Sequence, residues 1–230
     1  MTITPTTLTR AAGIAASAAG LIFAAVQIKH PHLDATSITT TEVAVRNSLK
    51  VLMAALALVG ISGMYLHQVK QMGKLGLLGY LLFAANYLVI MSTSFVAAYV
   101  LPSIAESNPS FVNDVLTAAN GGHATGDIGL LQIVLWIEAF LFLAGGLVFG
   151  IALYRARVLS RWASVLLAIG GIVSAALSLM PDAFHRLLAL PNSVALVALG
   201  YSLWLAAGSD TTAQPATVVG TPTPTAAGVR

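Results

Sequence analysis

The chain has 230 residues, of which 57% are hydrophobic and only 8% are charged, with a formal net charge of +3. Because ordinary soluble domains carry about 25% charged residues, this composition excludes water as the main solvent and predicts an integral membrane protein. The pI near 9.4 does not indicate nucleic-acid binding, since the cations flank apolar segments instead of forming a basic stripe with aromatic residues. Cysteine is absent, which excludes disulfides, thiolate metal sites and cysteine nucleophiles.

The apolar segments predict an all-α helical bundle with six transmembrane helices. A hydrocarbon core of about 30 Å needs about 20 helical residues, and six segments of this order occur along the chain. We expect the spans at 11–28, 48–66, 75–101, 128–153, 162–180 and 187–207. A polar leader over 1–10 precedes them, and the low-complexity segment 208–230 should be a disordered tail. A signal peptide is the alternative for the first segment, but its apolar run is long and lacks a clear cleavage site.

Local signals mark several helix ends. Residues 39–42 read Thr-Thr-Thr-Glu and fit a capping box, so the second helix should begin near Thr40, outside the membrane. Pro102 should end the third span, because proline lacks the N–H that continues a helix. Asn108 followed by Pro109 has the pattern of an N-cap with proline at the first helical position. This pattern predicts a short helix on the outer membrane surface.

Small residues repeat at a spacing of four in the first span, at Ala12, Ala16, Gly20 and Ala24. The spacing places them on one helix face, where a neighbouring backbone can approach closely. The fifth span repeats this spacing at Gly170, Ser174 and Ser178. Besides the lipid bilayer itself, these faces are candidate contacts for another helix, for a second copy of the chain or for a membrane partner.

The distribution of cations predicts the orientation. With six spans and a cytoplasmic N-terminus, the inner side receives seven cations and the outer side four, as the positive-inside rule requires. The long connection 103–127 contains no Lys or Arg and should lie outside. We therefore expect both termini in the cytoplasm and the bundle in the cytoplasmic membrane. The inner cations are Arg10, Lys70, Lys74, Arg155, Arg157, Arg161 and Arg230.

Three charged residues follow one another at a spacing of four near the start of the second helix. Glu42, Arg46 and Lys50 lie along one helix face. This ladder predicts a solvated face at the membrane interface.

Glu138 is the one acidic residue that must lie at bilayer depth, about 15 Å from the Ile128 end of its span. A carboxyl there costs about 2.5 to 3.5 kcal/mol and should face protein or water. Asn86 and Tyr87 on the third span lie at a similar depth, so the three residues predict one polar binding site. Two interpretations remain open: a carboxyl that binds protons or a substrate, as in carriers, or a neutral carboxyl that holds two helices together.

A second group of residues lies in the predicted outer loops. His30, His32, His123 and His185 accompany Asp127 and other carboxylates, and this is the ligand set of zinc or of a metal-activated water. The spacing differs from that of two histidines on one helix turn, so loop histidines at a polar interface are the simpler interpretation. No histidine falls inside a span, which argues against haem, and we predict no cofactor.

Three stretches carry a resemblance. The start of the first span at 10–13, the segment Arg157 to Ala163 and the closing segment Leu199 to Trp204 resemble uncharacterised multi-pass membrane proteins of the actinobacterial type. The resemblance implies a bundle of about six helices in a bacterial cell membrane. It implies no activity and no site residue.

The sequence thus favours a non-enzymatic membrane protein. We expect a small carrier or an accessory membrane subunit whose polar centre is Glu138 with Asn86 and Tyr87. The alternative is a membrane-embedded, metal-dependent hydrolase that uses the outer histidines and aspartates. No nucleophile motif or phosphate loop occurs in a strand-turn-helix context, and the glycines of 60–63 and of 145–146 lie inside apolar helices.

Overall fold

The computed structural model describes residues 4–28, 33–178 and 190–212, and this part of the chain is all-helical. The long helices are α1 (Pro5–Ala25), α2 (Thr41–His67), α3 (Val69–Phe95), α6 (Leu131–Ala156), α7 (Arg161–Ser178) and α9 (Leu190–Thr212). The short ones are η1 (Ser37–Thr39), the π-helical η2 (Val96–Val100), α4 (Leu101–Ile104) and α5 (Pro109–Ala119). The expectation of an all-α bundle is confirmed.

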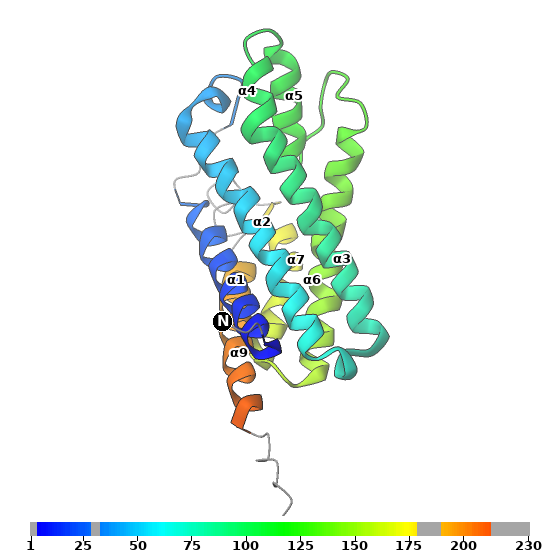
Figure 1. Cartoon of the computed structure of the whole chain (residues 1–230). Coiled ribbons are helices and arrows are strands. Elements are labelled where there is room, and N and C mark those ends of the chain that lie inside the picture. The colour runs from blue at the N-terminus through cyan, green and yellow to red at the C-terminus, as the bar shows by residue number, and fades with distance from the viewer. Residues whose placement is uncertain (1–3, 29–32, 179–189, 213–230) are drawn as a thin grey trace, which may run out of the picture.

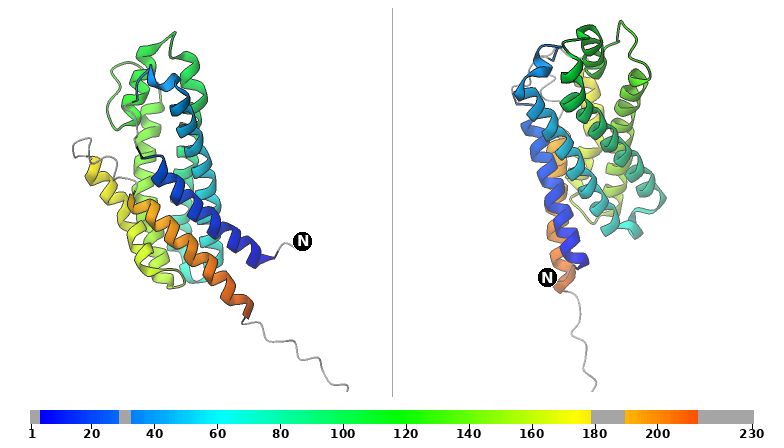
Figure 2. Two further views of the ribbon diagram at one scale, coloured as in Figure 1. Left: turned by 90° about the vertical axis from the view of Figure 1, so that its left-hand side faces the viewer. Right: turned by 45° about the horizontal axis from the view of Figure 1, so that its top comes forward.

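The long helices form a closed ring. Each packs on its neighbours along the chain, and α1 and α9 close the ring through an extensive contact. They run alternately up and down, so that the start of α1 and the end of α9 lie at one end and α4 and α5 lie at the other (Figure 1). The left view of Figure 2 shows α1 and α9 side by side and inclined to the steeper helices α2, α3 and α6. Below, the end with α4 and α5 is called the outer end and the opposite end the inner end.

Five described helices are long and apolar enough to cross a membrane. They are Pro5–Ala25, Thr41–His67, Val69–Ile104, Leu131–Ala156 and Leu190–Gly208. The predicted fifth span falls on α7, whose apolar part is shorter over Arg161–Val173. The structure therefore supports a helical bundle with the spans of a membrane protein.

The helix ends differ from the prediction in three places. The first helix begins at Pro5, inside the predicted leader, because Thr4 accepts a hydrogen bond from the Thr7 N–H at 3.2 Å. The last helix runs to Thr212, past the predicted boundary at 207. Pro102 does not end the third span, so that prediction is wrong. The π-helical turn η2 shifts the hydrogen-bond register, and Pro102 then falls in the first turn of α4, where a missing N–H is tolerated.

The two N-caps expected from the sequence are confirmed. Thr40 caps α2 by accepting a hydrogen bond from the Val43 N–H at 3.4 Å. Asn108 caps α5 by accepting one from the Phe111 N–H at 3.3 Å. Both side chains satisfy backbone donors that would otherwise have no partner at a helix start.

The small face of α1 packs on helices of the same chain. A Cβ at Gly60 of α2 would lie 2.6 Å from the Ala16 Cβ, and one at Gly20 would lie 2.5 Å from the Ser193 carbonyl oxygen of α9. Ser17 donates a hydrogen bond to the Val197 carbonyl at 3.1 Å across the same contact. The predicted close approach is confirmed, and it is what lets α1 touch both α2 and α9. The side chains of Ser174 and Ser178 lie outside the described residues.

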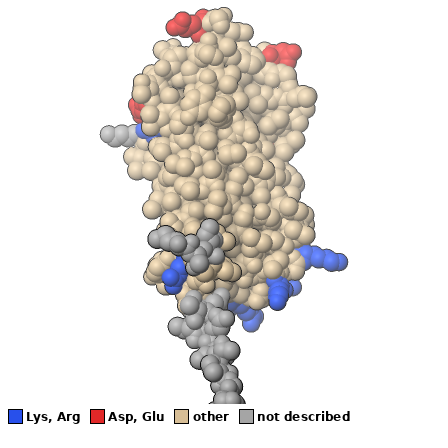
Figure 3. Space-filling model, viewed as in Figure 1, with Lys and Arg blue, Asp and Glu red and all other residues tan. Residues whose placement is uncertain are grey.

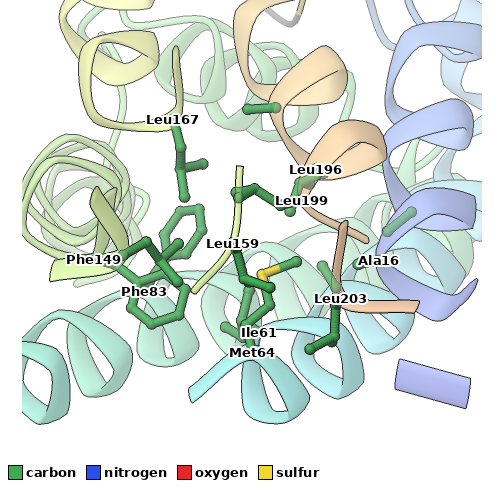
Figure 4. Close-up of a cluster of buried hydrophobic side chains, with 14 of the residues drawn as sticks. Ala16, Ile61, Met64, Phe83, Phe149, Leu159, Leu167, Leu196, Leu199 and Leu203 are labelled. Atoms are coloured by element: carbon green, nitrogen blue, oxygen red, sulfur yellow. The ribbon is translucent and has the colours of Figure 1, made fainter. Parts of the chain in front are cut away.

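An apolar core fills the inner half of the ring. Figure 4 shows Phe83 of α3 and Phe149 of α6 facing each other, with Leu167 and Leu196 pointing into the same space. The Phe83 and Phe149 ring centroids are 6.1 Å apart, and Phe83 meets Tyr87 edge-on at 4.9 Å. All these side chains are fully buried, so the inner half of the bundle is closed by packed side chains.

A second apolar cluster forms a cap over the outer end, made of residues 33–40 and 101–130. Its buried side chains come from η1, α4 and α5 and from the start of α2. Asp114 of α5 accepts hydrogen bonds from the backbone N–H and hydroxyl of Thr125 at 2.8 and 2.9 Å and from the Gly126 N–H at 3.1 Å. These bonds, the Thr125 backbone bond first, lower the pKa of Asp114. The cap is thus a folded unit rather than a loose loop.

The charges are separated between the two ends. Figure 3 shows acidic residues over the outer end and most of the basic residues at the inner end. The exposed acids Glu106 and Asp127 and the half-buried Asp114 all belong to the cap. The positive-inside rule predicts that the more basic end lies in the cytoplasm, and here that is the inner end.

Arg46 joins the end of α1 to the start of α2. Its Nη1 donates to the carbonyls of Val26 and Ile28 at 3.1 and 2.9 Å, and its Nη2 donates to Glu42 Oε1 at 2.8 Å. Because carbonyls at a helix end have no other backbone partner, we expect Arg46→Ala to lower the free energy of unfolding by about 1–2 kcal/mol. Thermal unfolding in detergent measures this, with Arg155→Ala as the exposed control. Equal melting temperatures for the two variants would contradict the role.

Candidate functional site

Glu138 is half-buried on α6 and contacts a residue that the sequence did not indicate. Thr93 of α3 donates a hydrogen bond from its hydroxyl to Glu138 Oε2 at 3.1 Å. The same hydroxyl lies 3.1 Å from the Val89 carbonyl oxygen and 3.2 Å from that of Ile90. A threonine hydroxyl has one proton, so it serves either the carboxylate or one of these carbonyls at a given moment.

Because the Thr93 proton has alternative acceptors, Glu138 can have a hydrogen-bond partner in both of its protonation states. When the carboxylate is charged, Thr93 donates to it. When the carboxyl is neutral, its own O–H can donate to Thr93 Oγ1 while the Thr93 proton turns to Val89 or Ile90. The geometry therefore accommodates the gain and loss of a proton without a change of helix packing.

Lys50 of α2 is the cation that interacts with Glu138. The interaction is electrostatic, and Lys50 is half-buried. Between residues that the structure describes, the only ion pair within 4 Å is Arg46 with Glu42, so Lys50 and Glu138 are farther apart than a direct salt bridge. The prediction of a solvated face holds only for Glu42, whose side chain is 61% exposed. The Arg46 side chain is 18% exposed and Lys50 is half-buried.

Asn86 and Tyr87 are fully buried on α3, but no hydrogen bond links them to Glu138. Asn86 Oδ1, Asn86 Nδ2 and the Tyr87 hydroxyl have no hydrogen-bond partner in the described part of the chain. Thr93 lies seven residues beyond Asn86 on the same face of α3, which is about 10 Å along the axis.

The helix register explains why Glu138 contacts Thr93. The position of Gly79 lies against Phe149 and that of Gly145 against Phe83, so α3 and α6 are antiparallel and Ile90 is the residue opposite Glu138. The depth estimate from sequence placed Asn86 opposite Glu138 and missed this register by about one helical turn. The register is set by the close contacts of Gly79 with Phe149 and of Gly145 with Phe83, which distances measured from the predicted span ends do not contain.

The π-helical turn η2 follows directly after the site on α3. It begins at Val96, and within it the Tyr99 hydroxyl is 2.8 Å from the Ser48 hydroxyl of α2. Single π-helical turns inside α-helices occur frequently at functional sites, because they widen the helix and reorient its side chains. Here the turn separates the site from the cap.

Two of the five candidate metal ligands, His123 and Asp127, lie in the described part of the chain, and each contacts a different neighbour. The His123 ring meets Trp136 edge-on at 5.8 Å between centroids. Asp127 accepts a hydrogen bond from the Gly129 N–H at 2.8 Å. Within 4–28, 33–178 and 190–212, no three His, Asp or Glu side chains gather as a metal site would require. His30, His32 and His185 lie outside the described residues.

A functional role for Lys50 could have been predicted from its position in the sequence. Lys50 falls inside the predicted span 48–66, and an ionisable residue at membrane depth indicates a functional site with a partner of opposite charge. Thr93 had no such signal, because threonines are common in membrane helices. Searches against protein-family models, curated proteins and solved structures find no match to this chain.

Proposed function

We propose that the chain is a six-span protein of the cytoplasmic membrane that acts as a small carrier, or as the accessory subunit of one. Its polar centre is Glu138 on α6, with Thr93 on α3 and Lys50 on α2. Asn86 and Tyr87 form a deeper polar layer of the same interior. The cargo is an ion or a small polar solute, because the side chains of the proposed centre are charged or polar.

The observation that carries the proposal is the hydrogen bonding around Glu138. The Thr93 hydroxyl lies within 3.2 Å of both the carboxylate and two backbone carbonyls, so the carboxyl can titrate in place. A carboxyl with a purely structural role needs only one of these arrangements. A proton-coupled or cation-coupled carrier needs both, since its carboxyl must release what it binds.

Lys50 supports a functional over a structural role. Placing a second charge inside the bundle adds a desolvation cost that a direct ion pair would partly offset. Because Lys50 and Glu138 are more than 4 Å apart, their attraction offsets less of this desolvation cost than a direct ion pair would. Charged side chains at membrane depth that are not closely paired are expected where transport or binding requires them.

The six-span topology rests on the charge separation and on the alternation of the helices. Reporter fusions after Lys74, Gly122, Arg157 and Arg230 should read inside, outside, inside and inside. The fusion at Arg230 decides whether α7 spans, because a surface-lying α7 would place that end outside. A cytoplasmic signal at Gly122 would contradict the proposed orientation.

Reconstitution tests the carrier role. Vesicles that contain the wild-type protein should carry protons or a common cation faster than empty vesicles, and Glu138→Gln should remove the difference. An absence of flux in the wild type across such a panel would leave Glu138 with a structural role.

A further inference from the structure

We infer that Lys50 and Glu138 are the two ends of a binding site for a small zwitterion, a solute that carries both an ammonium and a carboxylate group. The inference rests on the proposed carrier function and names the class of its cargo. The ammonium of the solute would bind Glu138, and its carboxylate would bind Lys50.

The first observation is that the two charges interact electrostatically without forming a direct ion pair. They are not within 4 Å of each other. Lys50 Nζ donates no hydrogen bond to any described residue, and Glu138 receives its one hydrogen bond, from Thr93, on Oε2. An ammonium has three protons to donate and a carboxylate accepts several bonds, so most of this capacity is unused. A zwitterion would supply the missing donors at Glu138 and the missing acceptors at Lys50 in one step.

The second observation is a set of buried polar atoms without partners on either side of the pair. Asn47, within one turn of Lys50 toward the outer end, is 4% exposed and its Nδ2 has no hydrogen-bond partner in the described part. Toward the inner end, Asn86 and the Tyr87 hydroxyl are fully buried and also have none there. Buried polar groups in folded proteins almost always have partners, so several in one region indicate a polar occupant.

The third observation is the direction from which a solute can arrive. Inward of Tyr87, the packed layer of Phe83, Phe149 and Leu167 closes the ring (Figure 4). The charged pair lies on the outer side of this layer, and η2 adjoins it. The solute would therefore reach the pair from the outer end, through or beside the cap.

Ligand-dependent thermal stability in detergent tests the inference. Glycine, β-alanine and γ-aminobutyrate place the two charges at increasing separation, and a saturating amount of the best fit should raise the melting temperature by roughly 3 °C or more. Methylammonium and acetate, each carrying one of the two charges, should produce a much smaller shift at the same concentration. No shift from any of the three zwitterions, or equal shifts from the single-charge controls, would overturn the inference.

Variants of Glu138 and Lys50 test whether these two residues cause the shift in melting temperature. Glu138→Gln and Lys50→Met should each remove the shift, while the matched controls Glu106→Gln and Lys74→Met, at exposed positions, should keep it. The exchange of both charges, Lys50→Glu with Glu138→Lys, should restore part of the shift, which a merely structural pair would not do. If a single variant does not fold, Glu138→Asp keeps the charge and should weaken binding by about tenfold or more. A shift that survives Lys50→Met would overturn the assignment.

The same preparations separate this inference from the carrier role. Proton or cation flux that depends on Glu138, without zwitterion binding, would overturn the inference and leave the carrier intact. Zwitterion binding without flux of any kind would support the site and contradict transport.

Discussion

Gly20→Leu is expected to prevent assembly of a stable bundle. A Cβ at this position would lie 2.5 Å from the Ser193 carbonyl oxygen and 2.8 Å from Val197 Cγ2, both on α9. A leucine side chain would force α1 and α9 apart and break the hydrogen bond from Ser17 to the Val197 carbonyl. We expect a loss of about 3 kcal/mol or more, which is a large share of the stability of a small domain. Thermal unfolding and size-exclusion profiles in detergent measure it.

Substitutions at two further glycines should destabilise the protein to different extents. A Cβ at Gly170 would lie 2.6 Å from the Asn192 Oδ1, so Gly170→Leu should also destabilise the protein by displacing a buried amide. At Gly208 the nearest atom is Arg10 Nη2, 2.9 Å away at the end of a flexible side chain. Gly208→Leu should therefore be nearly silent. Equal stability of all three variants would contradict the close packing of α1 and α9.

The sequence predicted those parts of the fold that depend on local chemistry. The caps at Thr40 and Asn108 were found because their side chains bond within three residues of themselves. The small face of α1 was found because a spacing of four defines a helix face. The prediction that Pro102 ends the third span was wrong because the effect of this proline depends on η2. No residue type in the sequence indicates the change of hydrogen-bond register in η2.

The candidate site depends on tertiary register, which the sequence does not specify. Glu138 was found because a charge at membrane depth is rare. Its partner follows from how α3 and α6 slide along each other, and this is fixed by the fit of Gly79 to Phe149 and of Gly145 to Phe83. Several other glycine and aromatic positions on these helices would satisfy the same pattern in sequence. The spacing of four shows that Lys50 shares a face of α2 with Glu42 and Arg46, but it does not show which helix that face meets.

Glu138→Gln should abolish transport while leaving the fold intact. Glutamine keeps the shape of the side chain and can still accept a hydrogen bond from Thr93, so the melting temperature should change little. It can neither titrate nor carry a charge, so it can neither bind nor release a proton or cation. Thr93→Val should retain the carboxyl but remove the hydroxyl that serves both protonation states. We expect it to slow transport without abolishing it.

Flux into reconstituted vesicles, compared between Glu138→Gln and its matched control, is the most direct test of the polar centre. The control is Glu106→Gln, the same substitution at an exposed acid of the cap. The account predicts that the wild type and Glu106→Gln carry protons or a cation above the level of empty vesicles. It predicts that Glu138→Gln does not, although it is folded and incorporated equally well. Equal flux through all three proteins would contradict a role for Glu138 in transport.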